Sequence, residues 1–260
     1  MLELVENIIL NVARKCCPSR STGRPLTDHR ITLEAICFVL KTGMAWRDLK
    51  STKFAPHYTT FHKTFRKWTQ LKVFETAYKT LLRLDAVKRR RGAKHYCIDS
   101  TLVKNQYGKD CLGRNPTDRG RKGMKLSAIV DDRGIPLALA AFGANVSDYK
   151  TVEPTFRQKL IPLNRRRLFF ADKGYDSQDV REYMSGQGLR PRVAKRGTKT
   201  PRVEVSARAC VENLFGWLDK HRRLLMRFDA LVDSYLQLTF LACCHILGRR
   251  QTMENKTSFS

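Results

Sequence analysis

Two patterns of apolar positions divide the chain near residue 90. Before it, apolar residues recur every three to four positions, which predicts amphipathic helices at residues 1–17, 27–40 and 59–68. After it, short apolar runs bounded by turn residues predict strands that alternate with helices. The most apolar stretch, residues 236–247, is too short to cross a bilayer.

The second part of the chain is predicted to begin with three strands and to continue as strands alternating with helices. The strands are expected at 95–103, 124–132, 135–143, 167–172 and 189–193, and the helices at 147–160, 177–188, 203–225 and 229–248. Residues 131–134 (DDRG) suit a tight hairpin between the second and third strands. This order predicts a ribonuclease-H-like α/β fold, with a mixed five-stranded sheet flanked by helices.

The segment around Gly43 has the outline of a DNA-reading motif. A helix, a glycine turn and a second helix with basic residues on its outer face follow one another there. This outline is typical of a helix-turn-helix protein. A plain helical bundle with a basic face is an equal alternative, because the same outline is common in bundles.

The net charge of the protein indicates a polyanionic partner. The chain has 50 Lys and Arg against 24 Asp and Glu, a formal charge of +26. Residues 1–95 hold 20 basic and 7 acidic residues and residues 96–260 hold 30 and 17, so both parts share the excess. Such a charge repels itself unless a polyanion neutralises it, and nucleic acid is the usual one.

The cysteines predict a reduced, intracellular protein. The chain has 8 cysteines, and none forms a C-x-x-C pair. No Cys/His set shows the spacing of zinc ligands, so no zinc site is expected.

Three acids interrupt apolar stretches and are the candidate catalytic residues. Asp99 lies in the first strand, Asp172 ends the fourth, and Glu212 lies on the long helix. Three converging carboxylates repel one another unless divalent cations separate them. Mg²⁺ prefers oxygen ligands, and two such ions about 4 Å apart can hold the attacking and leaving oxygens of a phosphodiester displacement.

Each of these acids also has an ordinary structural explanation. Asp99 could be a strand-end hydrogen-bond acceptor, Asp172 could pair with Lys173, and Glu212 could pair with Arg208 four residues earlier. Their joint occurrence in a strongly basic chain with this order of elements favours the metal site.

Five segments of the chain carry a resemblance to a known family. They are GRPLTDHRITLEAICFVLKTGMAWRDL (23–49), IDSTLV (98–103), GIPLALAAFGANVSD (134–148), ADKGYDS (171–177) and the glutamate region, where Arg208 precedes Glu212 by four positions and HRRLLMRFD (221–229) follows. These segments resemble the DDE transposases of bacterial insertion sequences, in the insertion-sequence-four/five superfamily, and the resemblance covers roughly residues 23–248.

The resemblance implies a short ribonuclease-H-like core in which Asp99, Asp172 and Glu212 are both catalytic residues and metal ligands. The expected cofactor is Mg²⁺, with Mn²⁺ as a substitute and two ions per site. Arg208 would touch phosphate or orient a carboxylate. Where the superfamily has a Tyr before this Arg and a Lys after the Glu, this chain has Val205 and Asp219. Lys220 is adjacent, and Arg223 is predicted on the same helix face as Glu212.

The resemblance further implies a transposase that binds the terminal inverted repeats of a transposon, cleaves DNA and transfers the 3′-hydroxyl end to target DNA. A DNA-binding protein without catalysis and a metal-dependent endonuclease without strand transfer are the alternatives. The expected partners are double-stranded DNA and further copies of the chain, as a homodimer or a larger oligomer, inside the cell and without a membrane.

The predicted organisation is a helical, helix-turn-helix-like DNA-binding region at 1–90, a DDE catalytic domain at 91–250 and a disordered tail at 251–260. The basic residues expected to contact DNA are Arg24, Arg47, Lys63, Arg66, Lys67, Arg89, Arg90, Arg91, Arg121, Lys122, Lys125, Lys173, Arg208, Lys220 and Arg223.

Overall fold

The structure is a computed structural model of the 260-residue chain. It describes all residues except 1, 19–26, 55–57, 89–91, 199–200 and 258–260. The backbone clusters into two compact units, one of residues 1–81 with 218–260 and the other of residues 82–217. The segment 218–250, predicted to be part of the catalytic domain, thus clusters with the N-terminal helices. Among the described residues, every helix is too short or too polar to span a lipid bilayer.

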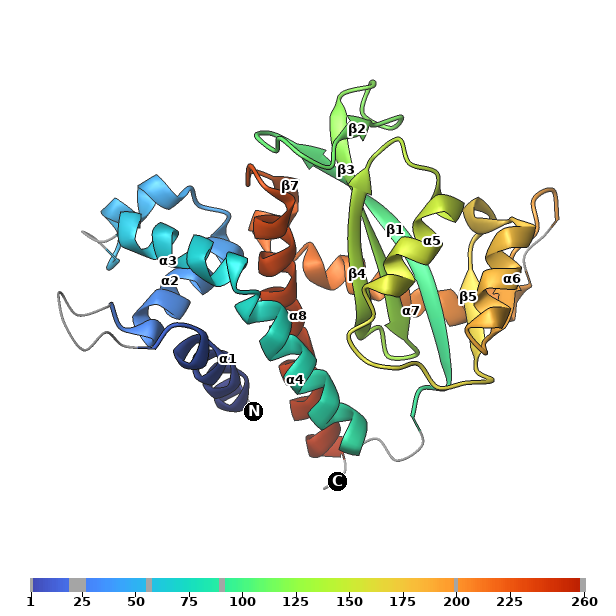
Figure 1. The fold of residues 1–260 in the computed structure, drawn as a ribbon, viewed down its shortest axis with the longest axis horizontal. Coiled ribbons are helices and arrows are strands. Elements are labelled where there is room, and N and C mark those ends of the chain that lie inside the picture. Colours follow the sequence, from blue (N-terminus) through green and yellow to red (C-terminus); the bar gives the residue numbers. More distant parts are fainter. Residues whose placement is uncertain (1, 19–26, 55–57, 89–91, 199–200, 258–260) are drawn as a thin grey trace. The chain divides into compact units, whose positions relative to one another are not determined.

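A mixed sheet forms the centre of the unit 82–217 (Figure 1). Its five main strands have the order β4-β3-β1-β5-β6, and the two-residue β2 pairs with β3. The first three pair antiparallel, whereas β5 pairs parallel with β1 and β6 pairs parallel with β5. The bounds are β1 His95–Asn105, β2 Gly113–Arg114, β3 Lys122–Asp131, β4 Pro136–Gly143, β5 Leu168–Ala171 and β6 Arg190–Val193. The five predicted strands and the ribonuclease-H-like sheet are confirmed.

The predicted hairpin between β3 and β4 is built around Asp131. Its carboxylate accepts the backbone N–H groups of Arg133 and Ile135, each at 2.9 Å. Gly134 has a φ of 79°, and a Cβ there would lie 2.6 Å from the Cys210 carbonyl oxygen. A glycine is therefore required at this turn, because α7 (Arg202–Leu218) passes so close to it.

Two layers of helices enclose the sheet. α5 (Asp148–Arg157) crosses one face and α7 lies behind the other (Figure 1). Phe156 of α5 packs its ring 5.1 Å from that of Phe169 in β5, whereas Phe170 turns toward His95 on the opposite face at 5.2 Å. The apolar run of β5 is therefore buried on both sides. The remaining elements here are η2 Lys173–Tyr175 and α6 Gln178–Gly186.

The helix predicted at 203–225 is wrong at its end, because α7 stops at Leu218. Three residues follow before the short 3₁₀ helix η3 (Arg222–Leu224). Arg223 is 5% exposed, and its Nη2 donates to Asp229 Oδ1 at 3.1 Å. Arg223 therefore does not share a helix face with Glu212 and is not placed to contact DNA, since its guanidinium is held inside by a buried carboxylate.

The unit formed by residues 1–81 and 218–260 is helical. Its elements are α1 Leu2–Cys16, α2 His29–Thr42, η1 Trp46–Ser51, α3 Tyr58–Gln70, the start of α4 Val73–Lys88, η3, β7 Met226–Arg227 and α8 Val232–Thr257. The predicted helices are all present, and α8 continues into the segment predicted to be a disordered tail. The segment of α4 received no prediction, although Phe74, Tyr78 and Leu81 show the helical spacing of buried residues.

The connection between α2 and α3 differs from the predicted glycine turn. Gly43 does end α2, with a φ of 74° and its N–H on the Val39 carbonyl. Residues 43–57 then separate the two helices. Within this connection, Trp46 stacks on Phe65 of α3 at 5.1 Å. The connection is longer than the three to four residues of a helix-turn-helix turn. A DNA-reading role for this region stays a prediction.

Candidate active site

Asp99 and Asp172 lie at neighbouring positions of two parallel strands. The pairing of β1 with β5 ends with Cys97 opposite Phe170, and each aspartate lies two residues beyond this pair. Because parallel strands run in the same direction, this register places Asp172, directly after the end of β5, beside Asp99 in the middle of β1. The prediction that these two acids meet is thus supported by the strand register.

Arg208 of α7 is the cation that both aspartates meet. Its Nη1 donates to Asp172 Oδ1 at 2.9 Å, and its Nη2 lies 3.7 Å from Asp99 Oδ2. The arginine side chain is 14% exposed, and its Nε is buried without a hydrogen-bond partner. Asp172 therefore pairs with Arg208 rather than with Lys173. Arg208 likewise turns toward the aspartates and not toward Glu212.

Burial makes the Asp99 carboxyl hard to ionise. Its pKa is raised from 3.8 to about 6, chiefly by burial, while Asp172 and Asp148 add negative charge nearby. The backbone N–H of Ser100, at 2.8 Å from Asp99 Oδ1, and the Arg208 guanidinium oppose the rise in this pKa. A further cation beside Asp99 would favour its charged form.

A cluster of polar side chains lies on the face of the sheet opposite to Asp99. Side chains alternate along a strand, so Ser100 points to the face of α5 rather than α7. Its Oγ donates to Asp148 Oδ1 at 2.8 Å, and the same oxygen accepts from Lys125 Nζ at 2.7 Å. A Cβ on Gly174 would lie 2.7 Å from Asp148 Oδ2, so the chain after Asp172 packs directly on this carboxylate.

The predicted DNA contact of Lys125 is wrong. This lysine was expected to contact DNA, but it is 7% exposed and donates to the Val146 carbonyl as well as to Asp148. Asp148, for its part, was noted in the sequence only as the last residue of a family-like segment. An acid one residue into a helix gave no sign that it would hold a buried lysine.

Glu212 is placed differently from the two aspartates. It is exposed on α7, one turn after Arg208. Among the described residues, the carboxylate oxygens of Asp99, Asp172 and Glu212 do not all lie within 4.8 Å of one another. The structure thus brings two of the three predicted acids to one cation and leaves the third on the helix that supplies it.

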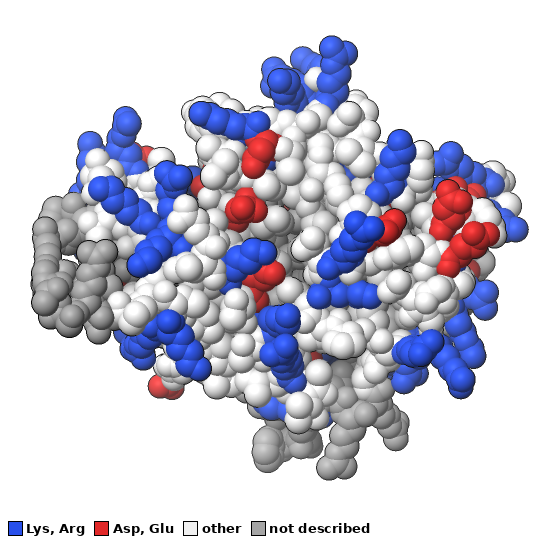
Figure 2. All heavy atoms as spheres, in the orientation of Figure 1, with Lys and Arg blue, Asp and Glu red and all other residues white. Residues whose placement is uncertain are grey.

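The other predicted DNA contacts fall into three groups. The exposed residues are Arg47, Lys63, Arg66, Lys67, Arg121, Lys122 and Lys220. Lys173 is half-buried beside Asp172. Arg24, Arg89, Arg90 and Arg91 lie outside the described residues. Figure 2 shows Lys and Arg spread widely over the visible surface, with fewer acidic residues between them.

The chain matches two family models over consecutive regions. A model described as a transposase DDE domain matches residues 90–247, and one described as a putative transposase of the IS4/5 family matches residues 7–78. A Burkholderia cepacia protein described as a putative transposase for insertion sequence element IS402 is 35% identical over 160 residues. The match covers 59% of this chain and 74% of that protein.

Two solved transposase structures show more distant likeness. A piggyBac transposase synaptic complex with hairpin DNA matches with a TM-score of 0.39 and 13% identity, over 77% of this chain and 50% of that chain. A Mos1 mariner paired end complex with Mn matches with a TM-score of 0.36 and 13% identity, over 96% and 85%. The chain therefore spans half the length of the piggyBac chain.

The DDE model covers more than half of the chain, and the Burkholderia cepacia relative is matched over most of its length. The chain therefore belongs to the DDE transposases of the IS4/5 family, enzymes that require a divalent metal ion to cut DNA strands and join them to new DNA.

Proposed function

We propose that Asp99, Asp172 and Glu212 hold the divalent metal of this transposase. The observation that carries the proposal is the meeting of Asp99 and Asp172 on one guanidinium, at 3.7 and 2.9 Å from its nitrogens. Two carboxylates that share a single cation form a site that favours positive charge. Their oxygens are also the ligands that Mg²⁺ prefers.

The proposed ions are two Mg²⁺ per site, which Mn²⁺ can replace. When bound, such ions make a water or hydroxyl nucleophilic and stabilise the leaving oxygen of a phosphodiester. Arg208 then has two roles of its own. It neutralises the aspartates in the metal-free protein, and it would offer a positive charge to a DNA phosphate when a metal ion is bound to the carboxylates.

Glu212 is the proposed third ligand. Residues four apart on a helix share a face, so Glu212 projects from α7 on the same side as Arg208, one turn further on. Because it is exposed, its carboxylate loses little hydration when it binds a metal ion. This assignment rests on the family motif and on the helix position together.

The proposed substrates are the terminal inverted repeats of a transposon and the target DNA into which the 3′-hydroxyl end is joined. The exposed basic residues named above would contact the phosphates, because Lys and Arg gain affinity by releasing counterions from DNA. A homodimer or a larger assembly is proposed to hold two transposon ends together.

The test is a cleavage and joining assay on a supercoiled plasmid that carries the element's ends. Cleavage is expected with Mg²⁺ or Mn²⁺, and none with EDTA. Asp172→Asn and Glu212→Gln should each abolish cleavage while DNA binding is retained. Asp179→Asn is the matched control, because this exposed acid on α6 should leave cleavage unchanged.

The alternatives predict different products in the same assay. Cleavage by the wild-type protein without joined products would identify an endonuclease. Tight binding without cleavage in either metal would identify a DNA-binding protein that lacks catalysis. Cleavage near the wild-type level in Asp172→Asn would show that the carboxylate assignment is wrong.

A further inference from the structure

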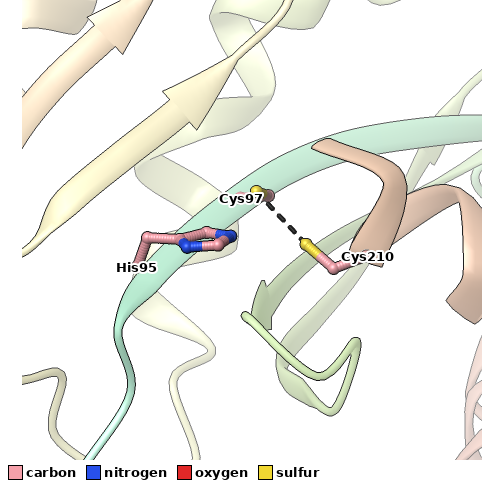
Figure 3. A group of neighbouring side chains, drawn as sticks. All are labelled: His95, Cys97 and Cys210. Atoms are coloured by element: carbon pink, nitrogen blue, oxygen red, sulfur yellow. Dashed lines mark hydrogen bonds between the residues drawn. The ribbon is translucent and has the colours of Figure 1, made fainter. Parts of the chain in front are cut away.

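A second group of potential metal ligands lies on the same strand and helix as the candidate active site. His95 and Cys97 are two residues apart in β1 and therefore point to the same face of the strand. Cys210 faces them from α7 (Figure 3). One ligand atom of each residue lies within 4.8 Å of the other two. Both cysteines are buried and His95 is half-buried. None of the eight cysteines, all of them among the described residues, takes part in a disulfide.

The three side chains surround one backbone oxygen. The Ala207 carbonyl oxygen lies 3.1 Å from His95 Nε2, 3.1 Å from Cys97 Sγ and 3.2 Å from Cys210 Sγ. The two sulfurs are 3.3 Å apart. The three ligand atoms therefore lie around one small volume beside the Ala207 carbonyl oxygen.

The size of this volume suits a metal ion after a small adjustment. Zinc bonds are about 2.3 Å to sulfur and about 2.0–2.1 Å to nitrogen. Ligands at the corners of a tetrahedron of these bond lengths lie roughly 3.3–3.8 Å apart. The two sulfurs, 3.3 Å apart, are about half an ångström closer than two zinc-bound sulfurs would be, and the other ligand atoms lie within 4.8 Å, so small side-chain rotations would open the site.

We propose that His95, Cys97 and Cys210 bind a soft divalent ion of the Zn²⁺ type. The fourth coordination position would lie on the side of the Ala207 carbonyl. Both cysteines would bind as thiolates, so their two thiol protons leave to solvent when the ion enters. No oxidant or reductant is needed.

The site would be distinct from the catalytic metal site in its chemistry. Thiolate and imidazole ligands select Zn²⁺, whereas carboxylates suit Mg²⁺. No zinc site was expected from the sequence, because no Cys/His set shows the close spacing of zinc ligands. Here the fold supplies Cys210 from a helix 113 residues after Cys97.

The proposed zinc ligands lie next to the candidate catalytic residues in the sequence. Cys97 lies two residues before Asp99, and Cys210 lies between Arg208 and Glu212. An ion shared by the two cysteines would join β1 to α7 beside the residues that the proposed function assigns to catalysis. The bound ion would therefore stabilise the unit that contains residues 82–217, whether or not the carboxylate assignment is correct.

The test uses the full chain, purified under reducing conditions, stripped with a chelator and titrated with Zn²⁺ or Co²⁺ alone. One Zn²⁺ per chain should remain after gel filtration in excess Mg²⁺. Co²⁺ should produce thiolate-to-metal charge-transfer absorption, which carboxylate ligands cannot give. His95→Asn should weaken Zn²⁺ binding by about tenfold or more, and both signals should disappear in Cys97→Ser and in Cys210→Ser.

Cys243→Ser is the matched control, because Cys243 is equally buried but lies on α8. It should keep both the zinc and the cobalt signals. Circular dichroism of each variant verifies its folding, and Cys97→Ala replaces Cys97→Ser if the serine variant fails to fold. The proposal is overturned if the wild-type chain retains no zinc, if the cobalt absorption persists in a folded Cys97 variant, or if mass spectrometry finds a Cys97–Cys210 disulfide in the reduced preparation.

Discussion

Replacing Asp99 with asparagine should stabilise the metal-free protein at neutral pH, although it removes a proposed catalytic residue. The Asp99 side chain is 24% exposed, and its pKa is raised from 3.8 to about 6, mainly by burial. Each unit of pKa corresponds to about 1.4 kcal/mol, so ionising this carboxyl in the folded state costs at most about 3 kcal/mol. Screening by solvent lowers the expected gain for Asp99→Asn to about 1–2 kcal/mol. Asparagine keeps an oxygen that can accept the Ser100 N–H.

The stability difference between Asp99→Asn and the wild-type protein should depend on pH. Because the pKa of Asp99 is higher in the folded than in the unfolded chain, the folded state binds the proton more tightly. The stability that this proton gives is fully present below pH about 4 and is lost as pH rises through about 6. Asp99→Asn should therefore differ little from wild type near pH 4.5 and should be more stable near pH 7.5.

The assay is calorimetric unfolding in EDTA at several pH values. A gain of this size corresponds to an increase in Tm of roughly 2–8 °C at pH 7.5. Under the proposed ligand assignment, millimolar Mg²⁺ should reverse the order, because it would bind and stabilise the wild-type protein and not the variant. Asp179→Asn, which changes an exposed acid, should show neither effect. A loss of stability in Asp99→Asn at neutral pH, or a difference that does not change with pH, would refute the reasoning.

Two further predictions concern the polar group around Asp148. Lys125→Met should lower the free energy of unfolding by about 1–3 kcal/mol in thermal melts, because the half-buried Asp148 loses its ammonium partner, whereas Lys150→Met on the exposed face of α5 should be neutral. Gly174→Ala should lower the cleavage rate about tenfold or more, because its Cβ would lie 2.7 Å from Asp148 Oδ2 and would displace the segment that follows Asp172. Gly186→Ala, where nothing lies within 4 Å of the added Cβ, is its control, and equal cleavage rates in the two variants would contradict the argument.

The sheet could be predicted from sequence because its signals are local. The apolar run of β5 is buried on both faces, and the Asp131–Gly134 turn fixes its own geometry through side-chain hydrogen bonds. The end of α7 could not be predicted from the sequence, because it depends on contacts that are not local. Residues 219–225 carry helix-compatible side chains, and the buried pair of Arg223 with Asp229 that draws the chain away from the helix depends on tertiary packing.

The sequence predicted which acids form the candidate site, but it did not predict which side chains contact them. Sequence position placed Asp99 and Asp172 at strand positions, and the parallel register then brought them together. Nothing local distinguished Lys125, which is buried on Asp148, from the exposed Lys122 three residues earlier. The strand period of two places Lys125 and Gly123 on one face and Lys122 on the other, yet it does not say which face a helix will cover.

Arg208 explains how the two aspartates can lie side by side without a metal ion. Two neighbouring carboxylates, one within β1 and one directly after β5, would repel each other, and the burial of Asp99 would add to the cost. The guanidinium of Arg208 lies within reach of both, and its Nε has no hydrogen-bond partner of its own. The charge of the arginine thus stabilises the metal-free arrangement, while the contact to Asp99 at 3.7 Å is too long for a strong hydrogen bond. The metal ion proposed for this site would therefore replace Arg208 at Asp99, which would leave the arginine available to a phosphate.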